Sequence, residues 1–236
     1  MSSQKQIIED FKKRFGVSIV AAKDRLEIDV AYLQADEEKT TAYIETFLSK
    51  ELSLYSTKVF KKCNLRKIIL CKNLVSSGEK RAGLAEPKWI FSGLLGNNIL
   101  INVDAPLDSY ARSVIHHELY HLIDDSDDIN GMYDNHWKDL NHPKFSYHDD
   151  LFANQIPKIA NGFVSSYAMT AVHEDKAETF SHMIVDYKGI EKLGKTDAVL
   201  RRKIERMKVL MNKFSSEFDE SFWKERAKAS NHLHSY

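Results

Sequence analysis

Apolar residues recur along the chain with two different spacings, and each spacing predicts one kind of secondary structure. A period of about 3.6 residues, which places apolar side chains on one face of a helix, runs through five segments. The tail that follows residue 220 also begins with a helical pattern. The five predicted helices cover residues 4–15, 36–61, 109–123, 173–189 and 196–214.

Four short runs rich in β-branched or other apolar residues predict strands. Turn-forming sequences, S-S-G-E-K-R-A-G and G-N-N, separate the last three, and G-N-N suits a hairpin turn that leaves a strand at the sheet edge. We therefore expect an α+β fold, with a small, mostly antiparallel sheet packed on the helix at 109–123 and further helices at both ends. The predicted strands are V-S-I-V-A-A (17–22), R-K-I-I-L-C-K-N-L (66–74), K-W-I-F-S-G-L-L (88–95) and N-N-I-L-I-N-V-D-A (97–105).

The chain of 236 residues is long enough to bury a hydrophobic core. It contains nine glycines and four prolines, and neither a linker nor an internal repeat divides it. We expect one domain over residues 1–236, with its core at about 36–215.

Positive and negative charges balance. Lys+Arg and Asp+Glu both total 34, so the net charge is zero and the pI is about 7.2. Neither nucleic acid nor an acidic membrane is expected as a partner, because both attract a basic surface. Cys63 and Cys71 bracket one predicted strand and are expected to be reduced thiols.

The sequence carries no recognisable secretory signal, and no apolar run approaches the roughly 20 residues that span a bilayer. Cytoplasm is therefore the default expectation for its location. Export by a dedicated secretion system, which needs no such signal, is compatible with the same sequence.

The segment S-V-I-H-H-E-L-Y-H-L-I-D-D (113–125) places three histidines and a glutamate within six positions of a predicted helix. His117 and His121 are four residues apart, so their rings share one helix face and can bind one ion. His-Glu-x-x-His is a zinc-binding pattern, in which Glu118 can take a proton from the attacking water. His116 lies about 100° from His117 around the helix and is expected to pack or to support a ligand.

A partly exposed helix whose histidines form local hydrogen bonds could carry the same residues. The flanking apolar positions favour a buried helix instead, and buried imidazoles need partners, which a metal ion supplies. A catalytic zinc usually has three protein ligands, so the segment predicts a third ligand elsewhere in the chain.

Two residues compete for the third place. Asp127 lies where the pattern His-Glu-x-x-His-x-x-Gly-x-x-His/Asp has its third ligand, with Met169 as a candidate Met-turn residue. That pattern needs a glycine at position 124, where this chain has aspartate. Glu174 is the second candidate, because it can complete the zinc shell while Glu178, four residues later, accepts an N–H from a ligating histidine. An exposed acidic helix start would account for the same two glutamates.

His-Glu-x-x-His followed by a Glu-x-x-x-Glu helix, with Tyr167 seven residues before the first glutamate, resembles the gluzincin-type catalytic domain of anthrax lethal factor and its relatives. The stretch H-W-K-D-L-N-H-P-K-F-S-Y-H-D-D (136–150) also resembles the W-x-x-L-N-P-x-x-F-x-Y loop of many bacterial zinc metallopeptidases. One inserted residue, so that His142 and Pro143 stand at the place of the proline, makes that match approximate. The resemblance covers about residues 80–188.

The resemblance implies a zincin-like fold and assigns roles to six residues. Phenolic O–H groups and carboxylates are chemically suited to the roles implied for the tyrosine and the glutamates. It implies His117, His121 and Glu174 as ligands of one zinc ion, Glu118 as general base, Tyr167 as donor to the oxyanion and Glu178 as the residue that orients His117.

We therefore expect a zinc-dependent peptidase, with one Zn²⁺ ion as cofactor and a protein or peptide as substrate. An extended peptide could pair with the edge strand expected at 97–105, which favours an endopeptidase. Two alternatives stay open: a metzincin-like peptidase that uses Asp127, and a zinc-containing binding or scaffold protein without peptidase activity. The sequence leaves the oligomeric state open.

Overall fold

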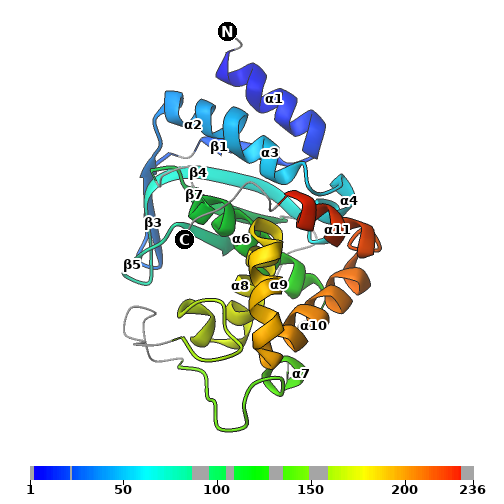
Figure 1. Cartoon of the computed structure of the whole chain (residues 1–236). Coiled ribbons are helices and arrows are strands. Elements are labelled where there is room, and N and C mark those ends of the chain that lie inside the picture. Colours follow the sequence, from blue (N-terminus) through cyan, green and yellow to red (C-terminus); the bar gives the residue numbers. More distant parts are fainter. Residues whose placement is uncertain are drawn as a thin grey trace. The chain divides into compact units, whose positions relative to one another are not determined.

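The computed structural model of the protein describes residues 3–21, 23–86, 96–104, 109–127, 135–148 and 159–229. The chain divides into two compact units, Met1–Ser126 and Asp127–Tyr236, called the first and the second unit below. Figure 1 follows the chain from the first unit in blue to green into the second unit in green to red.

The first unit combines helices with a mixed sheet (Figure 1). β4 is its longest strand and pairs in parallel with β1 and β7 and antiparallel with β3 and β5. β6 continues the sheet antiparallel to β7. The elements are α1 (Gln4–Phe15), β1 (Ser18–Ala21), β2 (Arg25–Leu26), β3 (Val30–Gln34), α2 (Glu37–Tyr43), the π-helix η1 (Ile44–Leu48), α3 (Ser49–Leu52), α4 (Thr57–Lys62), β4 (Leu65–Ser76), β5 (Glu79–Lys80), β6 (Gly83–Glu86), β7 (Asn97–Asn102) and α6 (Ser109–Asp127).

The α+β class is confirmed, and most strand pairings are antiparallel as expected, but β4 pairs in parallel with β7 at the centre of the sheet. β7 lies between β4 and β6, so the prediction that residues 97–105 form the sheet edge is wrong. Ile99, Leu100 and Ile101 are all buried, which is typical of a strand covered on both faces. The predicted strand at 88–95 lies outside the described residues.

Four short strands were missed by the sequence patterns, and one of them, β5, lies within the run interpreted as turn chemistry. β2 and β3 lie between two predicted elements, and β6 lies partly within the run interpreted as turn chemistry. Each of β2, β3 and β6 has at most five residues, which is too short for an alternation to stand out. Among the described residues, β6 and β2 form the two ends of the strand order.

The helix predicted over 36–61 is interrupted. It runs from Glu37 to Leu52, with a π-helical turn in the middle, and a second helix begins at Thr57. The side chain of Ser56 accepts the backbone N–H of Lys58 and so caps α4. Apolar periodicity continues across this break because both helices face the same core.

The second unit is helical. Among the described residues, α8 packs against each of the unit's other helices. The helix predicted over 173–189 ends at Val185, because the side chain of Asp186 accepts the N–H of Gly189 and starts α9. Much of the loop-rich stretch 124–165 lies outside the described residues. The elements are α7 (Asn135–Lys138), the 3-10 helix η4 (Tyr167–Met169), α8 (Val172–Val185), α9 (Tyr187–Thr196), α10 (Ala198–Phe214) and α11 (Glu220–Ala229).

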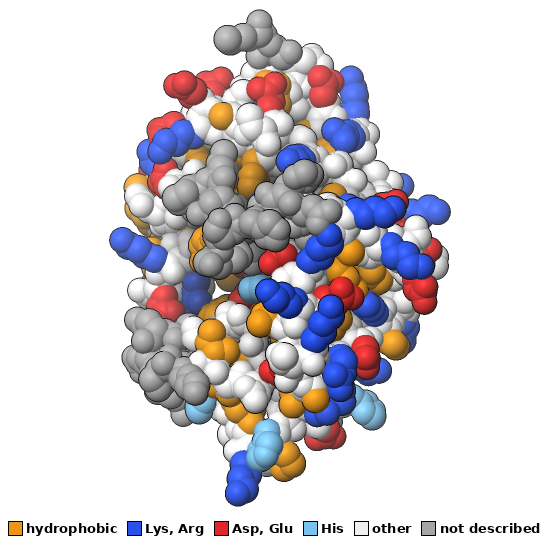
Figure 2. All heavy atoms as spheres, viewed as in Figure 1, with side chains coloured by type: hydrophobic (Ala, Val, Ile, Leu, Met, Phe, Trp, Pro, Cys, Tyr) orange, Lys and Arg blue, Asp and Glu red, His pale blue; other side chains and the backbone are white. Residues whose placement is uncertain are grey.

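Both cysteines are free and fully buried, as the sequence predicted for reduced thiols. Burial raises the pKa of each thiol to about 12, so neither is a reactive thiolate at neutral pH. None of the helices among the described residues has the length and apolarity to cross a bilayer. Figure 2 shows acidic and basic side chains interspersed over the visible face of the protein.

Candidate metal centre

His117 and His121 lie on neighbouring turns of α6. Several other side chains of this helix, among them Ile115, Leu119 and Leu122, are buried. The Nε2 atoms of His117 and His121 lie 3.0 Å apart, and their ring centroids lie 4.7 Å apart. Two nitrogens bound to one tetrahedral zinc, each at about 2.0–2.1 Å, stand about 3.3 Å from one another. The two imidazoles therefore fit a shared zinc ion.

Glu118 is buried beside these histidines and is fixed by the sheet. Its Oε2 accepts the backbone N–H of Ala85 on β6 at 2.6 Å. A Cβ atom on Gly83 would lie 2.7 Å from Val114 Cγ1 and 2.8 Å from Glu118 Cγ. Only glycine at position 83 thus lets β6 come close enough to fix this carboxylate.

Gly83 and Ala85 are functional candidates that the sequence patterns did not single out. Both lie on β6, which was itself missed. A signal was present in A-G-L-A-E, where small residues alternate with Leu84, but a run of this length is compatible with a turn as well.

His116 belongs to a separate buried network in the first unit. Its Nε2 donates to Glu51 Oε2 at 3.0 Å, and its Nδ1 lies 2.7 Å from the Tyr55 hydroxyl. Arg112 Nε donates to the other Glu51 oxygen at 2.8 Å. Both ring nitrogens of His116 are thereby occupied, which agrees with the expected packing role.

The pKa of Glu51 is set by two opposing influences. Burial, the largest, raises it, but the hydrogen bonds and positive charges of His116 and Arg112 outweigh burial and hold the pKa at about 2, against an ordinary value of 4.5. Because the folded state prefers the carboxylate, Glu51 stabilises the fold above about pH 4.5, and this contribution is lost as the pH falls toward 2.

Glu51→Gln is expected to remove this pH dependence. The wild-type protein should lose about 3 kcal/mol of unfolding free energy through Glu51 between pH 5 and pH 2, and the variant should lack that part of the decline. The variant should also be less stable at pH 7, since His116 and Arg112 lose their charged partner. Urea unfolding from pH 7 to pH 2 measures both effects, and parallel curves for the two proteins would contradict the role of Glu51.

Tyr167, Glu174 and Glu178 all lie in the second unit, on η4 and on the α8 that follows it. The Tyr167 hydroxyl donates to Glu174 Oε1 at 2.8 Å. His173 Nε2 lies 3.5 Å from the same Glu174 oxygen. Glu178 Oε2 accepts the Ser165 hydroxyl at 2.6 Å. The predicted site residues therefore form two groups, one in each unit.

The residues of the metzincin alternative have different surroundings. Asp127 is the last residue of α6, and Met169 is the last residue of η4. Met169 is buried, accepts the N–H of Ala160 on its sulfur and packs in an apolar cluster with Phe163 and Ala168. This packing gives Met169 a structural role within the second unit.

Comparison with known proteins agrees with a metal-binding function. Residues 95–222 match the family described as "Putative zinc-binding metallo-peptidase". The fold is similar to the crystal structure of a "putative zinc-binding metallo-peptidase" from Bacteroides caccae ATCC 43185, with a TM-score of 0.62 and 13% sequence identity over 96% of this chain and 92% of that chain. No curated protein matched the sequence significantly. Because the family match spans more than half of the chain, the protein belongs to the family described as "Putative zinc-binding metallo-peptidase".

Proposed function

We propose that the protein is a zinc-dependent peptidase of the gluzincin type, similar to the anthrax lethal factor catalytic domain, in which His117, His121 and Glu174 bind one zinc ion. The observation that carries the proposal is the 3.0 Å separation of the two histidine Nε2 atoms. Two imidazoles and a carboxylate are a ligand set that catalytic zinc uses in peptidases. Each of the three side chains offers one such ligand atom. Membership of a family described as zinc-binding supports the choice of metal.

Zinc, when bound, polarises the scissile carbonyl and lowers the pKa of the attacking water toward 7. Glu118 takes the proton from that water and then passes it to the leaving amine nitrogen. The N–H of Ala85 holds one oxygen of Glu118, which fixes the direction of the carboxylate before substrate arrives. A fixed base reduces the reorganisation needed in the transition state.

Tyr167 is proposed to donate its hydroxyl hydrogen to the oxyanion that develops on the substrate. In the described structure this hydroxyl donates to Glu174, so it must exchange one acceptor for another during the reaction. Glu178 is proposed to accept an N–H from His117 and so fix its tautomer. Ser165, which donates to Glu178, directs that carboxylate.

The proposed substrate is an extended segment of a protein or peptide. Within the described part of the sheet, β6 is paired on the β7 side alone, so its other side can accept a peptide strand through main-chain hydrogen bonds. β6 also carries the Ala85 N–H that contacts Glu118. Binding along a strand edge requires no free chain end, which favours cleavage within the chain.

Metal analysis of the wild-type protein tests the proposal. The purified protein is expected to contain one zinc per chain, to hydrolyse members of a peptide library and to lose this activity when a chelator removes the metal. Added zinc should restore activity. A protein that contains zinc but cleaves no peptide would instead be a zinc-containing binding or scaffold protein, and one without zinc would overturn the proposal.

A further inference from the structure

Asp175 is a fully buried carboxylate in the first turn of α8, and three donors converge on its Oδ2 atom. The donors are Trp137 Nε1 at 2.8 Å, the Tyr147 hydroxyl at 2.7 Å and Lys203 Nζ at 2.7 Å. The side chains of Asp175 and Lys203 are both 0% exposed. These four residues are called the Asp175 cluster below.

The Asp175 cluster is costly to bury. Burial raises the pKa of Asp175 and lowers that of Lys203, because it disfavours both charges. A buried ion pair can often be replaced by apolar residues without loss of stability, so stability alone does not account for such an arrangement. Buried polar groups can instead specify one arrangement of the chain segments that they join.

The segments joined by the cluster include those next to the proposed zinc ligand. Trp137 and Tyr147 belong to the segment 135–148, which contains the W-x-x-L-N motif of the sequence. Lys203 Nζ also donates to the Gly162 carbonyl at 2.7 Å, and the N–H of His148 donates to the Met169 carbonyl at 3.0 Å. Both contacts reach the segment 160–169, which ends in η4.

Asp175 directly follows Glu174 in the chain. Successive residues on a helix point about 100° apart, so fixing the Asp175 side chain also fixes the direction from which Glu174 leaves the helix. The N-cap residue of α8, Ala171, makes no side-chain cap hydrogen bond. The first turn of α8 is therefore anchored by Asp175 rather than by a cap.

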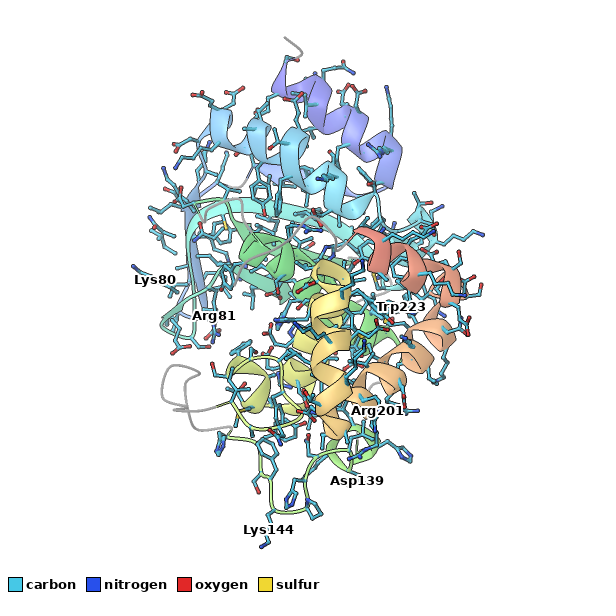
Figure 3. The ribbon with its side chains drawn as sticks, in the orientation of Figure 1. Lys80, Arg81, Asp139, Lys144, Arg201 and Trp223 are labelled. Carbon is cyan, nitrogen blue, oxygen red and sulfur yellow. The ribbon has the colours of Figure 1, made fainter. Side chains whose placement is uncertain are left out.

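We propose that Trp137 and Tyr147 are positioning residues, which act through Asp175 to direct the Glu174 carboxylate and thereby set the affinity for zinc. The inference rests on the proposed function and deepens it, since it assigns a role to the 135–148 segment. In Figure 3, Lys144 projects outward from the tip of this segment, so the segment also has a surface unconnected with the cluster.

The test measures zinc affinity in Trp137→Phe and Tyr147→Phe by competition with a chromophoric chelator. Each variant is expected to bind zinc about 10- to 100-fold more weakly, the range found when a residue that orients a metal ligand is removed. Matched controls are Trp223→Phe and Tyr187→Phe, which truncate buried aromatic residues of the same unit away from Asp175. The controls should keep zinc affinity within about 2-fold of wild type. Trp223 is labelled in Figure 3.

A spectrum of the cobalt-substituted protein adds a readout that reduced stability alone does not change. Cobalt d–d bands report the arrangement of the ligands, and they are expected to shift in the two cluster variants and to stay unchanged in the controls. Urea unfolding of the metal-free proteins identifies any variant that fails to fold, and Lys144→Ala provides a surface control on the same segment.

The outcomes separate this inference from the proposed function. Zinc affinity and cobalt spectra equal to wild type in both cluster variants, with Glu174→Ala still losing zinc, would overturn the inference alone. A wild-type protein that binds no zinc, or a Glu174→Ala variant that binds it as tightly as wild type, would overturn the proposed function. Weaker zinc binding with a shifted spectrum in the cluster variants, and in neither control, would support the positioning role.

Discussion

Replacing Glu118 with glutamine is expected to lower kcat for peptide hydrolysis by about 10²- to 10⁴-fold while one zinc ion stays bound. The carboxamide oxygen can still accept the N–H of Ala85, so the contact between β6 and α6 is retained. The amide cannot accept a proton from water, however, and the general base is lost. Steady-state hydrolysis of a fluorogenic peptide, with metal content measured on the same sample, checks both parts.

Glu79→Gln is the matched control for Glu118→Gln. It removes one carboxylate from β5 of the same sheet, where Glu79 pairs with Arg81 near the surface. Its kcat should equal that of wild type within about 2-fold, as expected of a surface ion pair. Retention of full activity in Glu118→Gln would rule out Glu118 as the base and would direct attention to another proton acceptor.

Glu174→Ala is expected to lose stoichiometric zinc, with affinity reduced by more than about 100-fold, a larger loss than removal of a residue that only orients a ligand. The variant would hold zinc through two histidines alone, and it would bind weakly because it lacks the ligand atom and the negative charge that the carboxylate supplies. Zinc content after gel filtration, together with titration against a chelator, measures this loss.

Asp127→Ala is the comparison that separates the two zinc-peptidase classes. It should keep zinc and activity if Glu174 is the third ligand. The opposite pattern, with zinc lost in Asp127→Ala and kept in Glu174→Ala, would establish the metzincin-like alternative. Glu174→Gln completes the set, since it keeps an oxygen for the Tyr167 hydroxyl but lacks the negative charge that strengthens zinc binding, and it is expected to bind zinc more weakly than wild type.

Helices with a strong apolar period were the best predicted part of the fold. α1 has the predicted limits of residues 4–15, because Ser3 caps its start and Gly16 adopts the left-handed conformation that ends it. The helix at 36–61 was predicted as one element because periodicity reports which face is buried and not where the backbone breaks. The break could have been located only from the N-cap residue of α4, Ser56. One capping serine is a weak signal in a sequence with many serines.

The sheet order could not be predicted from strand patterns alone. The apolar run at 99–101 is typical of a strand covered on both faces, but it does not identify the neighbouring strands, so the positions of β4 and β6 on either side of β7 could not be predicted. β6 was missed because four residues carry too little periodicity. The contact that fixes Glu118 depends on β6 and was missed with it.

The proximity of His117 and His121 on α6 was predictable, because i and i+4 positions on a helix meet by geometry that holds in every helix. The role of Trp137 and Tyr147 was not, since both residues act on Asp175 across separations of 38 and 28 positions. In the sequence, the segment that contains Trp137 and Tyr147 was noted only for its resemblance to a loop of bacterial zinc metallopeptidases. The burial of Asp175 beside the proposed ligand Glu174 is visible only after the chain has folded.

The close approach of β6 to α6 also bears on how relatives of this protein can be interpreted. A side chain at position 83 would occupy space beside Glu118. The glutamate would then have to move or be replaced by a shorter residue. A relative with a larger residue in place of Gly83 is therefore expected either to have shifted its edge strand or to have given up the glutamate.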